Sequence, residues 1–210
     1  MIKLSKRLMA VAALVQPGAA VADIGTDHGF IPVFLAESGI IKSAVASDIH
    51  KAPLDSCKRL VEERGLGNII KTRISDGLDK IDDNECDTII IAGMGGELIA
   101  QILSKCSWAE KKHIILQPMT HPETARKFLY DNGFEIDSDL IVKDGRHYYS
   151  VFDAHYTGEI QEKKRADYFL GNITDFTNKK YFSHLLNYFI NKSKSGEDYS
   201  DIILALERLL

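Results

Sequence analysis

Short runs of β-branched and other apolar residues alternate with amphipathic stretches from residue 21 to about residue 156. This alternation predicts strands separated by helices, which is the pattern of βαβ units around a parallel sheet. The predicted strands span residues 21–24, 43–49, 69–75, 87–92 and 113–117. The predicted helices between them span residues 30–38, 53–64, 95–105 and 121–131. Polar or glycine-rich residues follow each strand, and this is the edge where open α/β sheets bind ligands.

The sequence marks the end of one predicted helix and the start of another. Apolar residues recur at helical spacing through residues 4–15 and Pro17 and Gly18 stop the pattern, so a helix precedes the sheet. Before the helix at 121–131, Thr120 and Glu123 predict a capping box, with Pro122 in the first turn.

The pattern changes after the fifth strand. Two strand-like runs, residues 136–143 and 146–155, are joined by Asp144 and Gly145, which indicates a tight antiparallel hairpin. Five parallel strands followed by an antiparallel pair predict an α/β fold with a Rossmann-like, seven-stranded methyltransferase sheet. Nucleotide-binding oxidoreductases usually continue with another crossover helix instead.

Beyond residue 158 the strand signals end, and two helical stripes separated by residues 193–196 predict a helical hairpin. The stripes consist of Phe176, Phe182, Leu185, Leu186, Phe189 and Ile190, then Ile202, Ile203, Leu206, Leu209 and Leu210. We therefore expect a main domain over 1–157 and a small C-terminal helical domain over 158–210. The latter has eight Lys and Arg against eight Asp and Glu, so its charge count does not indicate a nucleic-acid grip.

Composition narrows the class of protein. The chain has 210 residues, 45% of them hydrophobic and 27% charged, which is ordinary for one main globular domain. With no run of about 18 apolar residues and no signal-peptide pattern at the start, a soluble cytoplasmic protein is expected. Cys57, Cys86 and Cys106 are too far apart to suggest a disulfide framework or a metal site.

The net charge of −4 argues against a protein that coats nucleic acid non-specifically, although it leaves room for a local basic patch. The oligomeric state stays open, with a monomer slightly favoured. No membrane partner and no metal are expected.

The turn after the first strand has the sequence DIGTDHG at residues 23–29. Two glycines alone would indicate only a tight strand-to-helix turn. Their spacing, however, is G-x-x-x-G rather than the G-x-G-x-x-G of pyrophosphate sites, and Asp23 and Asp27 flank it. Two carboxylates repel a pyrophosphate but suit a ligand with an ammonium and a sulfonium, which is S-adenosylmethionine.

Two further carboxylates follow the next strands. Asp48 lies 25 positions after Asp23, where a carboxylate accepts hydrogen bonds from both ribose hydroxyls. Asp76 and Gly77 follow the third strand and are placed to reach an adenine amino group. Either aspartate alone fits a solvated loop, but three carboxylates at successive strand ends predict one cofactor site.

The fourth and fifth strands end in residues suited to the acceptor. Gly93, Met94, Gly95 and Gly96 follow the fourth strand; their glycines either let strand and helix pack closely or leave room for the acceptor, with Met94 against a flat base. Gln117 ends the fifth strand and offers an amide to a base edge. His121 fits a first-turn helix residue as well as a ligand role.

Four segments together resemble the bacterial tRNA adenine-N1 methyltransferase family called TrmK, which modifies adenine 22: LSKRL at 4–8, ADIGTDH at 22–28, IAGMGG at 91–96 and LQP at 116–118. The resemblance covers nearly the whole chain, including a coiled-coil-like C-terminal domain, although the tail is short.

The resemblance implies a site with two sides. The S-adenosylmethionine pocket would be formed by Asp23, Gly25, Asp27, His28, Asp48, Asp76, Gly77 and Gly93, and the tRNA backbone would be contacted by Lys6 and Arg7. We add the neighbouring Thr26, Gly29 and Ile49 to the candidate cofactor residues, and Gly95, Gly96 and Gln117 to the candidate tRNA-binding residues.

The chemistry expected of such a site needs no general base, because N1 of neutral adenine already presents a lone pair. The GMGG motif stands where methyltransferases of exocyclic amino groups carry an Asn-Pro-Pro-Tyr type of motif. Proximity and alignment should then carry most of the catalysis, with Met94 beside the base and Asp27 stabilising the positive charge that develops on it. The alternatives are a small-molecule or other RNA methyltransferase, and a non-catalytic module that binds S-adenosylmethionine.

Overall fold

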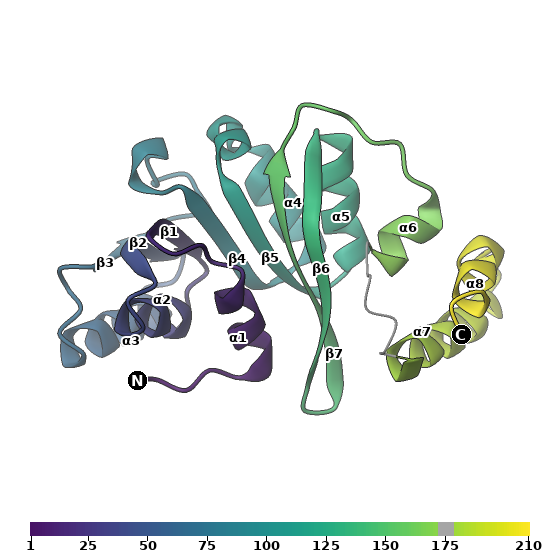
Figure 1. Cartoon of the computed structure of the whole chain (residues 1–210), viewed down its shortest axis with the longest axis horizontal. Coiled ribbons are helices and arrows are strands. Elements are labelled where there is room, and N and C mark those ends of the chain that lie inside the picture. Colours follow the sequence, from purple (N-terminus) through teal and green to yellow (C-terminus); the bar gives the residue numbers. More distant parts are fainter. Residues whose placement is uncertain (172–178) are drawn as a thin grey trace.

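A computed structural model of the chain describes residues 1–171 and 179–210 and shows a seven-stranded sheet between two layers of helices (Figure 1). The strands are β1 (Ala19–Ile24), β2 (Ile41–Asp48), β3 (Ile70–Ile74), β4 (Thr88–Gly95), β5 (His113–Thr120), β6 (Phe134–Asp144) and β7 (His147–Tyr156). Their order is β3-β2-β1-β4-β5-β7-β6, with β1 to β5 parallel and β7 antiparallel to both neighbours. The predicted seven-stranded methyltransferase fold is confirmed.

Five helices accompany the sheet: α1 (Lys6–Ala13), α2 (Phe30–Glu37), α3 (Lys51–Glu63), α4 (Gly96–Ser104) and α5 (Pro122–Asp131). Short 3-10 turns at Asp83–Glu85 and Ser107–Lys111 precede β4 and β5. The helices of the main domain, like its strands, lie within a few residues of the predicted ranges. Among the helices in the described part of the chain, none is long and apolar enough to cross a bilayer.

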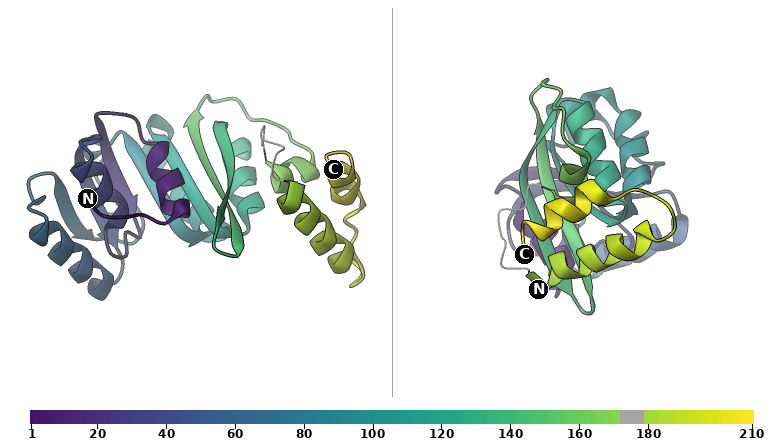
Figure 2. Two further views of the ribbon diagram at one scale, coloured as in Figure 1. Left: turned by 60° about the horizontal axis from the view of Figure 1, so that its bottom comes forward. Right: turned by 90° about the vertical axis from the view of Figure 1, so that its right-hand side faces the viewer.

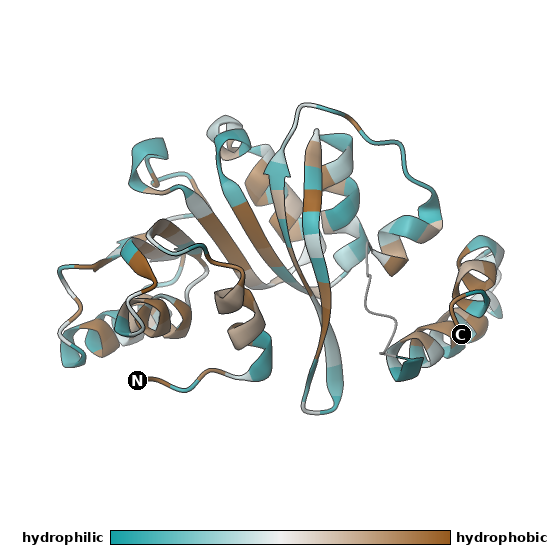
Figure 3. Cartoon of the chain, viewed as in Figure 1, coloured by the Kyte–Doolittle hydropathy of each residue, from teal (hydrophilic) through white to brown (hydrophobic). Residues whose placement is uncertain are grey.

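The central strands are apolar on both faces because each face supports a separate core. In β4, Ile89 and Ile91 belong to the core under α4 and α5, whereas Ile90 belongs to the core under α1, α2 and α3. Successive side chains of a strand point to opposite faces, so a strand buried on both sides has to be a continuous apolar run. Figure 3 shows these runs in the middle of β4 and β5.

The start of α5 differs from the prediction. Its N-cap is His121, which adopts a left-handed conformation with φ 52° and makes no side-chain cap, so the predicted capping box of Thr120 and Glu123 is wrong. The reason is that β5 continues through Thr120, which leaves that residue in the strand. Pro122 is the first helical residue, as predicted. Glu123 accepts a hydrogen bond from the ring of His121 instead, at 3.1 Å.

The β6–β7 hairpin is confirmed, with its turn one residue later than expected. Asp144 pairs with His147 in the ladder, so the loop consists of Gly145 and Arg146. Gly145 has a φ of 61°, which a glycine adopts without strain. The hairpin extends past the sheet toward α1, where the Asp144 carboxylate accepts a hydrogen bond from the backbone N–H of Arg7 at 3.1 Å (Figure 1).

The described residues of the C-terminal segment form the helices α6 (Arg165–Leu170), which the sequence pattern did not predict, α7 (Lys179–Ser193) and α8 (Ser200–Glu207). α7 and α8 lie side by side, as the two stripes predicted (Figure 2). Phe182, Phe189, Ile202 and Leu206 form their common core with Ala166 of α6. Phe176 of the first stripe lies outside the described residues. The boundary at residue 158 stays a prediction.

A buried ion pair connects α5, the hairpin and α6. The guanidinium of Arg126 donates two hydrogen bonds to Asp139, at 2.7 and 2.9 Å, and both side chains are fully buried. It also donates to the hydroxyl of Ser150 and to the backbone carbonyl of Tyr168, both at 3.0 Å. A side chain at Gly171 would collide with this pair, since its Cβ would lie 2.2 Å from the carboxylate. The cluster therefore fixes where the chain leaves the sheet for the C-terminal helices.

Removal of this cation should destabilise the fold strongly. Arg126→Met takes away the charge that compensates the buried Asp139 carboxylate, and we expect a loss of about 3 to 5 kcal/mol in the free energy of unfolding. Urea denaturation followed by circular dichroism measures it. The double variant with Asp139→Asn, which removes both charges, should be more stable than Arg126→Met alone. Equal stability of the two variants would contradict the electrostatic explanation.

Candidate functional site

The turn between β1 and α2 is built from left-handed residues pinned to the next strand. Gly25, Asp27 and Gly29 have φ values of 71°, 50° and 74°. The backbone N–H groups of Gly25 and Thr26 both donate to the carbonyl of Ser47 in β2, at 2.8 and 2.9 Å. A side chain at Gly25 would be strained at this φ, and Met94 would have to move, since its methyl group lies 2.1 Å from where the Cβ would be. The turn thus brings its backbone to the carboxyl edge of the sheet in one fixed conformation.

Asp23 is the last but one residue of β1 and is 3% exposed. The hydroxyl of Thr26 donates to its carboxylate at 2.5 Å, and no ion pair to Asp23 forms within residues 1–171 and 179–210. Burial raises the pKa of Asp23 to about 6; the charge of Asp48 adds to this effect and the Thr26 hydrogen bond opposes it. A buried carboxylate is therefore held at the strand end without a compensating cation.

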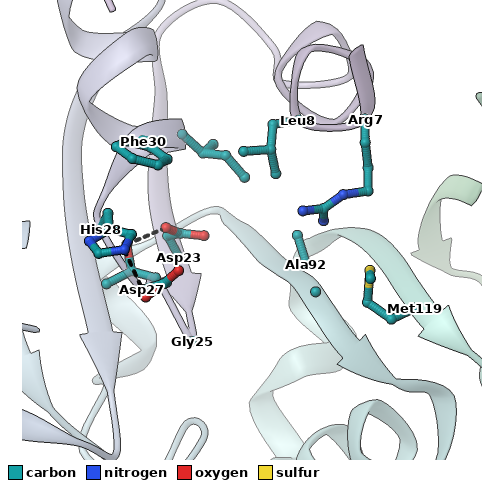
Figure 4. A pocket seen from close by; sticks show the side chains of 12 residues that line it. Arg7, Leu8, Asp23, Gly25, Asp27, His28, Phe30, Ala92 and Met119 are labelled. Atoms are coloured by element: carbon teal, nitrogen blue, oxygen red, sulfur yellow. Dashed lines mark hydrogen bonds and ion pairs between the residues drawn. The ribbon is translucent and has the colours of Figure 1, made fainter. Parts of the chain in front are cut away.

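A cavity of about 320 Å³ opens at this edge, between the β1–α2 turn, α1 and the ends of β4 and β5 (Figure 4). Its size suits a small-molecule ligand. Asp23, Asp27 and His28 line one side, and Arg7 of α1 and Met119 line the other, as Figure 4 shows. The remaining lining residues are Leu8, Gly25, Thr26, Phe30, Ile31, Ala92 and Gly93. One wall is therefore acidic and the opposite wall basic.

Asp27 and His28 are the exposed part of the acidic wall. The Asp27 side chain is 69% exposed, and its carboxylate lies 3.6 Å from Nε2 of His28. The His28 ring also packs against Phe30, with 5.3 Å between ring centroids. The exposed carboxylate of Asp27 thus faces the part of the cavity open to an incoming molecule.

Arg7 is held in the basic wall by three contacts. Its guanidinium donates to the side-chain oxygen of Gln117 and lies over the ring of Tyr149, 5.6 Å from the centroid. Its backbone N–H donates to Asp144. Gln117 is fully buried, and its amide nitrogen donates to the carbonyl of Pro118 at 2.8 Å. The amide expected to contact a base edge is therefore used to orient Arg7.

The predicted cofactor residues form one continuous edge, but the cavity takes in only part of it. The predicted cofactor residues that line it are Asp23, Gly25, Thr26, Asp27, His28 and Gly93, and Arg7, predicted for the tRNA side, lines it as well. Asp48 and Ile49 at the end of β2, and Asp76 and Gly77 after β3, continue the edge outside the cavity. Asp48 is half-buried, with one oxygen accepting the backbone N–H of His50 at 2.8 Å, and Ile49 is 53% exposed.

Several predicted residues have packing reasons of their own. A Cβ at Gly29 would lie 2.5 Å from the sulfur of Cys57, and one at Gly96 would lie 2.0 Å from the carbonyl oxygen of His121. Met94 is half-buried beneath Gly25 rather than in the cavity. Gly95 lies beside Thr120, where a Cβ would come within 3.2 Å of the hydroxyl. These roles agree with the close-packing interpretation of the glycine motif.

Lys6 and Arg7, predicted as a pair, separate in the structure. Arg7 points into the cavity, whereas Lys6 is exposed on α1 outside it. The other lining residues that the sequence did not single out are Leu8, Phe30, Ile31, Ala92 and Met119. Met119 lies near the end of β5, two residues after Gln117, so its position along the sequence already pointed to the site. The position of Leu8 did not, because nothing in the spacing says that α1 packs over the strand ends.

The described residues hold no cluster of three or more His, Cys, Asp or Glu side chains able to bind a metal ion.

Comparison with known proteins gives four related results. Residues 4–152 match the model of a family described as a methyltransferase domain. A relative named tRNA (adenine(22)-N(1))-methyltransferase, from Bacillus subtilis, is 39% identical over 166 residues, which are 75% of this chain and 70% of the relative. The crystal structure of a putative tRNA (m1A22) methyltransferase from Streptococcus pneumoniae has a TM-score of 0.89, with 28% identity over 99% of this chain and 100% of that one. The same protein crystallised with S-adenosyl-L-methionine has a TM-score of 0.86, with 29% identity and the same coverage.

The raised pKa of Asp23 predicts a pH-dependent cost to folding. The folded protein holds this proton more tightly than the unfolded chain, so the free energy of unfolding falls as the pH rises from about 3.8 to about 6. Asp23→Asn removes that cost while keeping an oxygen for Thr26. We expect the variant to be more stable than the parent at pH 8, by up to about 3 kcal/mol, and equally stable near pH 4. Urea denaturation at both values measures this, and a pH-independent difference would count against it.

Proposed function

The chain belongs to the tRNA (adenine(22)-N(1))-methyltransferase family, and we propose that it transfers the methyl group of S-adenosylmethionine to N1 of adenine 22 in tRNA. The observation that carries the proposal is the cavity at the carboxyl edge of the sheet, with carboxylates on one wall and Arg7 on the other. The two walls match the two substrates, of which one is cationic and the other a polyanion.

The acidic wall fits S-adenosylmethionine. The Asp23 carboxylate faces the cavity without a cationic partner in the described part of the chain, and the ligand's ammonium and sulfonium groups supply positive charge. A cation bound there returns the pKa of Asp23 toward its ordinary value, so binding and ionisation favour each other. A solved relative crystallised with S-adenosyl-L-methionine supports this choice of cofactor.

The edge beyond the cavity fits the nucleoside part of the same molecule. Asp48 is half-buried and uses one carboxylate oxygen to accept the backbone N–H of His50, so we assign the carboxylate to a ribose hydroxyl. Ile49 and Ile74 are 53% and 45% exposed and follow β2 and end β3, where they offer an apolar surface to a flat base. We assign Asp76 to the amino group of that base.

The basic wall fits the RNA. Arg7 uses one donor on Gln117 and keeps further donors facing the cavity beside Gly93. We assign these donors to a backbone phosphate of the acceptor nucleotide, because arginine binds phosphate oxygens through several N–H groups at once. We assign Lys6, which lies outside the cavity, to a more distant contact with the tRNA backbone.

The chemistry that S-adenosylmethionine supplies is an electrophilic methyl group. Gly93 leaves open space in front of β4, since the nearest atom to a Cβ there is Nη1 of Arg7 at 3.9 Å. A base edge therefore approaches the strand end without obstruction. N1 of adenine needs no proton removed, so the site has to align the base and exclude its amino group from the reacting position. The exposed Asp27 carboxylate stabilises the positive charge that forms on the base.

The direct test is methyl transfer to total tRNA. We expect S-adenosylmethionine and the protein to produce 1-methyladenosine, detected by nucleoside analysis after digestion, at position 22. Recovery of N6-methyladenosine would contradict the assignment of N1 as the acceptor atom. Absence of transfer to any tRNA would contradict the assignment of tRNA as the substrate. Asp23→Asn serves as the control, because loss of the charged contact should weaken cofactor affinity about tenfold or more in calorimetry while the fold persists.

The different positions of Lys6 and Arg7 predict different effects. Arg7→Ala should lower kcat/KM for tRNA at least tenfold, since it loses a phosphate contact inside the cavity. Lys6→Ala, the neighbouring cation outside the cavity, should change it less than about threefold. Steady-state kinetics with an unmodified transcript measures both. Equal losses would mean that the two cations act together as one surface patch.

A further inference from the structure

A second cavity, distinct from the cofactor cavity, lies between α5 and α6. It has a volume of about 480 Å³ and is lined by Glu123, Thr124, Lys127, Lys163, Arg165, Tyr168 and Phe169. We refer to it as the α5–α6 groove. α6 lies beside α5 in Figure 1, so the groove separates the main domain from the start of the C-terminal helices.

The walls of the groove are aromatic and held in place. Tyr168 packs against Tyr130 of α5, with 6.3 Å between ring centroids. Phe169 meets the edge of Phe189 in α7, with centroids 5.1 Å apart and planes at 86°. Both residues are half-buried and line the groove, and the ammonium of Lys127 lies over the Tyr168 ring, 5.4 Å from its centroid. A flat ligand would therefore meet an aromatic surface already fixed in orientation.

The rim of the groove is basic, although the C-terminal segment as a whole has balanced charge. Lys127 pairs with Asp131 at 2.5 Å, and Arg165 donates to the carbonyl of Asp198 at 2.7 Å. Lys163 forms no ion pair with any residue that the structure describes. Its ammonium lies over the ring of Tyr130, 4.8 Å from the centroid.

The lining carboxylate, Glu123, lies at the opposite end from Lys163 along α5 and is bonded to His121. Arg165 is also 3.5 Å from Asp201, outside the groove lining. Of the three cations that line the groove, Lys163 is therefore the one without a carboxylate partner among the described residues.

Aromatic walls beneath a basic rim match the chemistry of an unstacked nucleotide. Single-stranded nucleic acid binds where bases stack on aromatic side chains and phosphates meet Lys or Arg. An acidic peptide would use the cations but gain little from the aromatic walls. The surface therefore favours RNA over protein.

The groove is within reach of the acceptor site. Met119 lines the cofactor cavity and Glu123 lines the groove, four positions later. Four residues span at most about 14 Å, so the Glu123 end of the groove lies within that distance of the cavity lining at Met119. An adenine that leaves its stack to be methylated exposes the face of its neighbour, which then needs a new stacking partner.

We propose that the α5–α6 groove binds an unstacked nucleotide next to the acceptor adenine in the same tRNA, with its base against Tyr168 and Phe169 and its phosphate at Lys163. The proposal rests on the proposed function.

The test compares two neighbouring lysines. Lys163 lines the groove, whereas Lys164 is exposed beside it and contributes its backbone N–H, not its side chain, to the start of α6. Lys163→Glu should weaken binding of an unmodified tRNA transcript about tenfold and lower the salt dependence of binding by roughly one phosphate contact. Lys164→Glu carries the same change in net charge and should stay within about twofold of the parent. Calorimetry with S-adenosylmethionine should give the same cofactor affinity for all three proteins.

A second readout reports stacking directly. Phe169→Trp places an indole in the groove, and its fluorescence should be quenched when the unmodified transcript is added. The parent, whose one tryptophan is Trp108, provides the baseline. Addition of S-adenosylmethionine alone should leave the new signal unchanged.

The outcomes separate the groove from the function. If the parent methylates tRNA but the two lysine variants bind it equally well, or the indole is not quenched, the groove assignment is wrong and the function stands. Quenching caused by a second copy of the chain, seen without RNA as a dependence on protein concentration, also overturns it. If the parent neither binds nor methylates tRNA, the proposed function fails and the groove assignment fails with it.

Discussion

Parallel strands cannot be joined by tight turns, so each connection from β1 to β5 has to cross a face of the sheet. Both faces are consequently buried, and the strand ends gather at one edge, where the chain leaves each strand with polar residues. The β6–β7 hairpin is the exception, because antiparallel strands need no crossover. The turn of this hairpin extends toward α1, where Asp144 accepts a hydrogen bond from the backbone N–H of Arg7. This contact places the basic side chain of Arg7 opposite the acidic strand ends. The two walls of the cavity thus follow from one difference in strand direction.

The acidic wall lowers the stability of the protein when no cofactor is bound. A carboxylate at Asp23 is buried and repelled by Asp48, so in the free protein it resists ionisation up to about pH 6. The same features make it a strong site for a cation, since water has already been displaced and the hydroxyl of Thr26 fixes the oxygen. A bound cation therefore offsets the free-energy cost of ionising Asp23 in the folded protein. An amide at this position would suit the fold better and the cofactor worse, which is the expected conflict between stability and function at a binding site.

Periodicity was sufficient to predict the fold because a sheet covered on both faces demands unbroken apolar strands, and β4 and β5 supply them. It was insufficient for features set by contacts between distant segments. The helix start at His121 depends on how far β5 continues, and the role of Gln117 depends on Arg7, 110 positions away. The motif at 23–29 predicted the acidic wall because its residues are consecutive. The basic wall joins residues from α1, β5 and β7, which no local pattern connects. α6 was missed because six residues are too few to show a period.

The buried pair of Arg126 and Asp139 connects the stability of the domain to the shape of the α5–α6 groove. Arg126 points from α5 into the core, while Lys127, the next residue, faces the groove. The same guanidinium bonds the backbone carbonyl of Tyr168, whose ring is a groove wall. The spacing between rim and wall is therefore set in part from the core, together with the Lys127 ammonium that lies over the Tyr168 ring. A groove wall bonded to the core loses less conformational entropy when an RNA strand binds than an unanchored wall would. An ion pair that adds little net stability compared with an apolar core can persist for this reason, because it fixes a geometry that apolar packing would leave less defined.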